Sequence, residues 1–177
     1  MIEEKYKTFW RRFWAGWVDT VVLLPLYFLD MFIWNNHQNI SVFILLLWYG
    51  IYSLSYTVYS IIMHGKLGQT LGKMAMRVKV LDISETPLSM SQAIKRDIVP
   101  LGLTIVGIVL EAQTILSGVN IYDPKLSKYD ASFYLTMLST SGWFTAEVIT
   151  MLFSNKRRAL HDYIADSVVV KLPRKLI

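Results

Sequence analysis

Four long apolar stretches limit what this chain can fold into more than any other feature. They cover residues 13–34, 41–63, 98–118 and 131–153, and each is long enough for a helix to cross the roughly 30 Å hydrocarbon core of a bilayer. Only 18% of the residues are charged and the mean hydropathy is +0.39, so the chain has fewer charged groups than a soluble domain normally carries. We therefore predict an all-α membrane protein built as a bundle of four transmembrane helices.

The first apolar stretch is expected to be a retained helix. It follows basic residues, as a signal peptide would, but it is too long for the apolar region of a signal peptide and has no small-residue cleavage site. It also contains Asp19 and Pro25. Residues 13–34 are therefore interpreted as a true span.

The placement of Lys and Arg predicts the orientation. The N-terminal segment, the loop 64–97 and the tail 154–177 together hold sixteen of the eighteen basic residues. Basic residues concentrate on the cytoplasmic side of membrane proteins, so both termini are expected in the cytoplasm and the protein in the plasma membrane. The same segments should favour anionic lipid. They flank spans and form no separate basic domain, which argues against a nucleic-acid partner.

The loop and the tail are expected to fold together into a small two-strand element. Residues 77–80 alternate polar and apolar side chains, and residues 167–171 form a run rich in β-branched residues, both of which are typical of strands. A lone strand leaves its backbone groups unpaired, so we predict that residues 78–80 pair with residues 168–170. Ser89 and Gln92 have the spacing of a capping box, which predicts a short helix through Arg96.

Four acidic residues lie within the predicted spans, namely Asp19, Asp30, Glu111 and Glu147. Each costs about 2.5–3.5 kcal/mol on insertion scales, so each needs a reason to be there. At 1.5 Å per residue, Asp19 and Glu147 lie roughly 9 Å from the cytoplasmic ends of their spans, Glu111 roughly 20 Å in and Asp30 roughly 26 Å in. Arg12 shares one helix face with Asp19 and Asp30.

Two interpretations of these acids stay open. Carboxylates at staggered depths can relay protons or bind a small cation. Alternatively, the acids and the neighbouring Thr and Gly residues hold the helices together through polar contacts. The third and fourth spans carry such small and polar residues at helical spacing, and these faces should point into the bundle. The third-span set is Thr104, Gly107, Glu111, Thr114 and Gly118, and the fourth-span set is Thr136, Thr140, Trp143, Glu147 and Thr150.

No motif indicates an enzyme. The chain has no Cys, which excludes thiol nucleophiles, thiolate ligands and disulfides. It lacks the phosphate-binding, dinucleotide-binding and zinc-protease motifs. His161 and Asp162 are adjacent, but no positioned Ser or metal site accompanies them, so a structural hydrogen bond is the favoured interpretation. We expect no cofactor, no metal and no catalytic activity.

Three segments resemble the RDD family of bacterial membrane proteins. The sequence RFWAGWVD from Arg12 to Asp19 is similar to the family's first-span signature. The sequence GQTLGKMAMRVKV resembles its loop motif, with Gly68, Thr70, Gly72, Lys73 and Arg77, and RRALHDYIADSVVVK resembles its C-terminal motif, with His161 and Asp162. The resemblance implies that Arg12 and Asp19 are the family's named arginine and first aspartate, and Asp162 its second aspartate.

Two functions follow as hypotheses. Some RDD members are linked to the exchange of cations for protons, which implies a transporter of small cations with Asp19, Glu111 and Glu147 as carriers. Others resemble partners of larger membrane proteins, which implies an accessory or regulatory role. A four-span transporter would need to form a homo-oligomer to enclose a pathway, whereas an accessory protein would bind a partner membrane protein. Glu111 and Glu147 lie in the region where this chain departs from simpler members, so no family role transfers to them.

Overall fold

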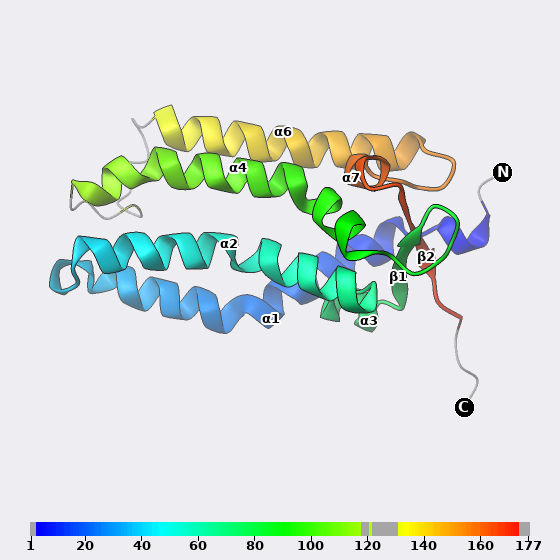
Figure 1. Cartoon of the computed structure of the whole chain (residues 1–177), viewed down its shortest axis with the longest axis horizontal. Helices are drawn as coiled ribbons and strands as arrows, with labels where there is room; N and C mark the ends of the chain where they lie inside the picture. Colours follow the sequence, from blue (N-terminus) through cyan, green and yellow to red (C-terminus); the bar gives the residue numbers. More distant parts are fainter. Residues whose placement is uncertain (1–2, 118–120, 122–130, 174–177) are drawn as a thin grey trace.

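The computed structural model describes residues 3–117, 121 and 131–173. Four long helices run side by side in an elongated bundle (Figure 1). They are α1 (Phe9–Asn35), α2 (Val42–Leu67), α4 (Met90–Leu116) and α6 (Ala131–Phe153). Each covers one of the four apolar stretches, so the prediction of a mainly helical protein is confirmed. Gly118, Lys125 and Lys128 lie outside the described residues.

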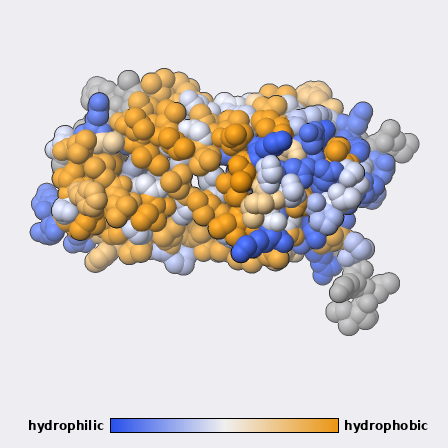
Figure 2. Space-filling model, in the orientation of Figure 1, coloured by the Kyte–Doolittle hydropathy of each residue, from blue (hydrophilic) through white to orange (hydrophobic). Residues whose placement is uncertain are grey.

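Three of the helices are long and apolar enough to cross a membrane. They are the stretch Glu4–Asn35, which contains α1, and the helices Val42–Leu67 and Met90–Leu116. Large apolar side chains such as Phe28, Phe43 and Val109 are exposed along them, and Figure 2 shows apolar residues covering most of the length of the bundle. Helix α6, which carries many Ser and Thr residues, is not among the three in the part of the chain described. A fourth span therefore stays a prediction.

The third apolar stretch belongs to a longer helix than the sequence pattern predicted. Ser89 and Gln92 do form the capping box, but the helix they begin runs without interruption through Pro100 to Leu116. The prediction of a short helix ending at Arg96, separate from a span starting at residue 98, was wrong. Proline removes one backbone hydrogen bond and bends a helix without having to end it, and α4 bends along its length in Figure 1.

All of the remaining described elements except η2 gather at one end of the bundle. The chain begins with the short helix η1 (Glu4–Tyr6), and the loop after α2 holds helix α3 (Leu71–Ala75) and strand β1 (Val78–Asp82). The tail holds helix α7 (Leu160–Ile164) and strand β2 (Ser167–Lys171). The opposite end carries the short helix η2 (His37–Asn39) between α1 and α2. The first and last described elements, η1 and β2, lie together at the end that holds the strands (Figure 1).

Strands β1 and β2 pair, as predicted, and the structure shows that the pairing is antiparallel. Lys79 lies opposite Val170, and Val80 lies opposite Val169. One face of the pair packs on Leu88 and Ala93 at the start of α4, and the other packs on Tyr6 of η1. Because both faces are covered, β2 is apolar throughout its centre and does not alternate. The loop and the tail therefore form one folded unit beneath the helices, which we call the end unit.

The sheet core should contribute measurably to stability. Val169 is 1% exposed, so Val169→Ala should lower the free energy of unfolding by about 2 kcal/mol through lost burial and a residual cavity. Thermal unfolding of the purified protein in detergent measures this loss. The control is Val21→Ala, at an exposed position on α1. Equal unfolding midpoints for the two variants would contradict a packed end unit.

Candidate functional site

Asp19 holds helix α3 against the membrane helices. Its carboxylate is 1% exposed and accepts three hydrogen bonds from neutral donors. The Tyr59 hydroxyl donates to Oδ1 at 2.8 Å, the Thr70 hydroxyl to Oδ2 at 2.6 Å, and the Gly72 backbone N–H to Oδ1 at 2.7 Å. The last donor belongs to the first turn of α3, where backbone N–H groups lack partners within the helix. This bonding favours the structural interpretation of Asp19.

The loop motif supplies the turns that bring α3 to this position. Gly68 ends α2 with a left-handed φ of 69°, a conformation that costs glycine little. Thr70 caps α3 by accepting a hydrogen bond from the Lys73 backbone N–H at 3.3 Å. A Cβ at Gly72 would lie 2.0 Å from the backbone oxygen of Ala15, so only glycine permits this close packing of α3 on α1. Arg77 has a φ of 54°, and its carbonyl accepts from the Leu172 N–H at 2.9 Å.

Asp162 joins two arginines from different helices. Arg12 of α1 donates to its Oδ2 at 2.7 Å, and Arg96 of α4 donates to its Oδ1. All three side chains are buried or nearly so, with exposed fractions of 8%, 3% and 0% for Arg12, Arg96 and Asp162. Burial alone would raise the pKa of Asp162, but the two guanidinium charges outweigh it and hold the pKa well below its ordinary value. We call these three residues the arginine clamp.

His161 connects the arginine clamp to α6. Its Nδ1 lies 2.5 Å from Glu147 Oε1, while Arg12 and Arg96 approach its Nε2 at 3.1 and 2.7 Å. Arginine only donates hydrogen bonds, so Nε2 must be the acceptor. Nδ1 must then carry the hydrogen and donate its hydrogen bond to Glu147. The backbone N–H of His161 also donates to Glu147, at 3.2 Å. The pair therefore links helix α6 to α7 through a carboxylate inside the protein.

These groups surround one cavity, which we call the basal cavity. It has a volume of about 240 Å³ and lies where α1, α2, α3, α4, α6 and α7 meet. Its polar lining comprises Arg12, Asp19, Tyr56, Lys73, Arg96, Glu147 and His161. Of the predicted acids, it brings Asp19 and Glu147 together with Arg12. Asp30 and Glu111 are not part of its lining.

The comparison with known families agrees with this arrangement. The model of the RDD family matches residues 6–166, which includes the first-span segment, the loop segment and the C-terminal segment as far as Asp166. The chain belongs to the RDD family. No curated protein and no solved structure gives a significant match. In this RDD protein, the first-span arginine, Arg12, binds Asp162 directly, and Asp19 binds the loop motif.

The other predicted acids of the RDD protein lie elsewhere. Asp30 is fully buried and accepts a hydrogen bond from the Trp48 indole N–H at 2.8 Å. Glu111 lies within electrostatic range of Tyr49 on α2. The faces of small and polar residues predicted on the third and fourth spans do meet. Between them lies a cavity of about 290 Å³, which is lined by Thr104 and Gly107 of α4 and by Thr136, Thr140 and Trp143 of α6. Within the described residues no three His, Asp or Glu side chains converge as metal ligands.

Two residues of the site were not singled out from the sequence. Arg96 was counted only as a basic loop residue, yet it is buried in the arginine clamp. The feature that could have identified Arg96 is its position in a helix that continues from the capping box into the third span. Tyr59 was treated as an ordinary span residue, although Tyr52, Tyr56 and Tyr59 recur at helical spacing along one face of α2.

Lys73 is the cation of the basal cavity whose charge is least compensated. It comes from α3, and within the described residues its ammonium makes no hydrogen bond or ion pair. Burial, and then the neighbouring charges of Arg96 and Arg12, lower the pKa of Lys73 to about 7. The side chain can therefore gain or lose a proton near neutral pH.

This depressed pKa predicts a pH-dependent stability. Unfolded Lys73 titrates near 10.5 and folded Lys73 near 7, so between these values the unfolded chain binds more protons and stability rises with pH. We expect the thermal unfolding midpoint in detergent to increase from about pH 7 to about pH 9, and to increase less in Lys73→Met. Lys66→Met, at an exposed position on α2, is the matched control. An unchanged pH slope in Lys73→Met would contradict the assignment.

Proposed function

We propose that all four long helices cross the plasma membrane of a bacterium, with both termini in the cytoplasm. The pairing of β1 with β2 supports this arrangement, because β1 precedes α4 and β2 follows α6. A chain that leaves this side along α4 must return along α6 for its strands to meet. The concentration of Lys and Arg in the same segments supports a cytoplasmic location for the end unit.

Cysteine labelling tests this topology without background, because the chain has no Cys of its own. Asn36→Cys should react with an impermeant maleimide on intact cells, since it is exposed beside η2 at the far end of the bundle. Ser84→Cys and Asn155→Cys, exposed in the loop and the tail, should react only after the cells are opened. Labelling of Asn155→Cys on intact cells would exclude the fourth crossing.

We further propose that the protein exchanges small cations for protons and catalyses no chemical reaction. The observation that supports this proposal most directly is the basal cavity, where Glu147, His161 and Lys73 meet beneath the spans. Lys73 titrates near neutral pH. A carboxylate that accepts a hydrogen bond from a histidine can give up that hydrogen bond and bind a cation instead. Asp19 acts in this proposal by holding α3, and through it Lys73, in place.

The roles within the cavity then follow from the contacts. Glu147 is the cation-binding carboxylate, and His161 Nδ1–H is the donor that a bound cation displaces. Arg12 and Arg96 keep His161 Nε2 in its accepting form. Protonation of Lys73 opposes a cation in the same space by charge repulsion, which couples the two events. A pathway through the rest of the membrane is expected to need an oligomer.

Flux through proteoliposomes tests the exchange. A pH-sensitive dye inside the vesicles should report proton movement when a Na⁺ or K⁺ gradient is imposed on the wild type. Glu147→Gln should lower this flux at least tenfold, while Asp166→Asn, a side chain 77% exposed in the tail, should leave it unchanged. Glu111→Gln tests the other predicted carrier. Full flux in Glu147→Gln would refute the role of Glu147.

A wild-type protein without any flux would support the alternative, an accessory role beside another membrane protein. In that case the contacts of Asp19, Glu147 and the arginine clamp serve only to build the end unit. Stoichiometric co-purification with a second membrane protein from the native host would then be expected. Flux in the wild type, combined with no co-purifying partner, would refute the accessory role.

A further inference from the structure

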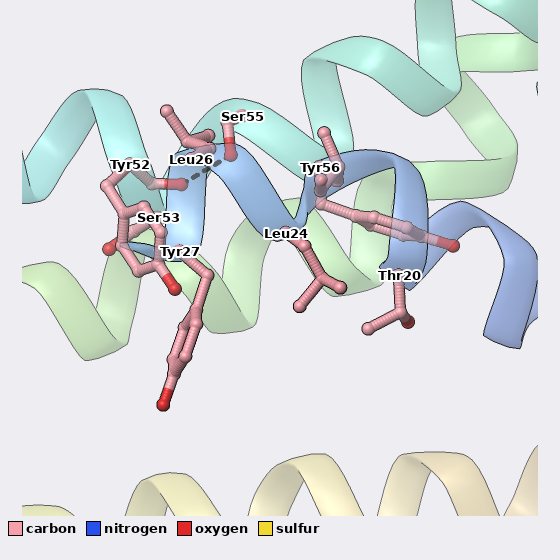
Figure 3. Close-up of a pocket in the computed structure, with 9 residues that line it drawn as sticks. Thr20, Leu24, Leu26, Tyr27, Tyr52, Ser53, Ser55 and Tyr56 are labelled. Carbon is pink, nitrogen blue, oxygen red and sulfur yellow. Dashed lines mark hydrogen bonds between the residues drawn. The ribbon is translucent and has the colours of Figure 1, made fainter. Parts of the chain in front are cut away.

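Another cavity lies next to the basal cavity, and its surface is mainly apolar whereas the basal cavity is lined by charged groups. It has a volume of about 450 Å³ and lies between α1 and α2; we call it the seam cavity. Thr20, Leu24 and Tyr27 of α1 and Tyr52, Ser53 and Tyr56 of α2 line it (Figure 3). Leu23, Leu26 and Ser55 complete the wall, so six of the nine lining residues carry a hydroxyl group on an otherwise apolar surface.

The two cavities are neighbours along α1. Tyr56 lines both of them. On α1, Asp19 lines the basal cavity and its neighbour Thr20 lines the seam cavity. A molecule that entered both would therefore place one end among charged groups beside the end unit and the other among apolar groups at the depth of the spans.

The basal cavity suits an anionic end group. Arg12, Lys73 and Arg96 bring cationic groups to it, with the carboxylates of Asp19 and Glu147 in the same lining. Those carboxylates are already engaged, Asp19 by three donors and Glu147 by His161. Asp162 offsets the charge of only one of the two arginines. The charges of Asp19 and Asp97 also act on Lys73, but its ammonium makes no hydrogen bond or ion pair with a described residue, which leaves its donors available to an anion.

The seam cavity suits an acyl chain. At the roughly 30 Å³ that a water-sized group occupies in a liquid, its volume of about 450 Å³ holds on the order of fifteen methylene groups. A bilayer supplies chains of this kind at high local concentration. Rings of Tyr27, Tyr52 and Tyr56 offer apolar faces along the wall (Figure 3).

We infer that the two cavities together form a binding site for one anionic phospholipid, with its phosphate at Lys73 and one acyl chain in the seam cavity. This differs from the general attraction of basic segments to an anionic membrane surface, because it specifies one lipid held between helices. It also does not depend on cation exchange, since binding can be measured without any flux.

Native mass spectrometry of the purified protein tests the site. The protein in a nonionic detergent, near pH 6.5, is titrated with phosphatidylglycerol or with phosphatidylcholine of the same acyl chains. We expect one phosphatidylglycerol bound per chain, at least tenfold more tightly than phosphatidylcholine, because the quaternary ammonium of phosphatidylcholine offsets its phosphate charge and is repelled by the cations of the basal cavity. Equal binding of the two lipids would overturn the inference.

Two pairs of variants locate the lipid. Lys73→Met should weaken phosphatidylglycerol binding at least tenfold, and Lys66→Met, which removes an exposed cation from α2, should not. Leu24→Trp should weaken binding by filling the seam cavity, whereas Leu47→Trp, at a position 56% exposed on α2, should leave it unchanged. The second pair keeps the test decisive if Lys73→Met fails to fold. Equal effects within both pairs would refute the site.

Inorganic phosphate distinguishes a lipid from a free anion. If the basal cavity alone is responsible, phosphate at millimolar concentration should displace phosphatidylglycerol and should bind as tightly in Leu24→Trp as in the wild type. That result would overturn the lipid assignment in favour of a free phosphate site. Continued retention of phosphatidylglycerol in the presence of phosphate would support a ligand that occupies both cavities.

Discussion

Replacing Asp162 with asparagine should cause the largest loss of stability of any single change in this protein. The substitution removes the carboxylate charge that pairs with both Arg12 and Arg96 in the arginine clamp, and leaves two guanidinium groups with little exposure. Removing one partner of a buried ion pair costs about 3–5 kcal/mol because the other charge remains uncompensated. Thermal unfolding in detergent, together with the yield of folded protein, measures the loss.

A second substitution separates unpaired charge from lost packing. Adding Arg96→Met to Asp162→Asn removes one of the stranded charges, so the double variant should recover part of the lost stability. Asp166→Asn, four residues along and exposed, is the control for the change of carboxylate to amide and should unfold like the wild type. A double variant less stable than Asp162→Asn would contradict the charge explanation.

The same carboxylate predicts how the wild type responds to acid. Because its pKa is lowered in the folded state, the ionised form of Asp162 contributes stability above its ordinary pKa of 3.8, and that contribution is lost progressively as the pH falls below about 5. We expect the unfolding midpoint to decline with acid more steeply in the wild type than in Asp162→Asn. Parallel declines would show that another group dominates the acid response.

Gly72→Ala should disrupt the contact between α3 and α1. The new Cβ would lie 2.0 Å from the Ala15 backbone oxygen and 2.9 Å from the Asp19 carboxyl carbon, and neither helix can give way without breaking the hydrogen bonds of Asp19. Overpacking of this kind costs about 1–3 kcal/mol and more where backbone must move. The unfolding midpoint in detergent and the titration of Lys73 should both change, since α3 carries that side chain.

Gly50→Ala provides the matched control. Gly50 lies within α2, and nothing comes within 4 Å of a Cβ built there. Alanine favours a helix interior over glycine by about 0.5–1 kcal/mol, so this variant should be as stable as the wild type or slightly more stable. A Gly72→Ala protein that matched Gly50→Ala in stability would mean that α3 does not pack on α1 as described.

Much of the fold could be predicted because it follows from local pattern and from the membrane. The apolar stretches determined where the long helices lie, and the β-branched run at residues 167–171, together with the need to pair backbone groups, identified the partner of β1. The capping box at Ser89 was correct as well. The extent of α4 was missed because the capped helix was expected to end at Arg96 and a separate span to begin at residue 98, whereas one helix continues through both.

The candidate site was harder to predict because its contacts join distant parts of the chain. Periodicity along one helix placed Asp19 and Glu147 on inward faces, but it could not indicate that Asp19 binds α3 or that Glu147 binds His161. Depth along a helix axis suggested a ladder of acids across the membrane. Lateral position decides which side chains meet, and only the packing of the helices brings Arg12, Arg96 and Asp162 together.

The pairing of β1 with β2 also has a consequence for biogenesis. A ribosome completes β1 before α4 and α6 have been made, so β1 must remain without its partner until nearly the whole chain has been translated. Asp162 likewise reaches Arg12 only at this late stage. A chain truncated before residue 160 would hold its membrane helices but expose an unpaired strand edge. Closure of the end unit therefore requires translation beyond β2, and a chain that stops earlier leaves this strand edge open to quality-control proteases.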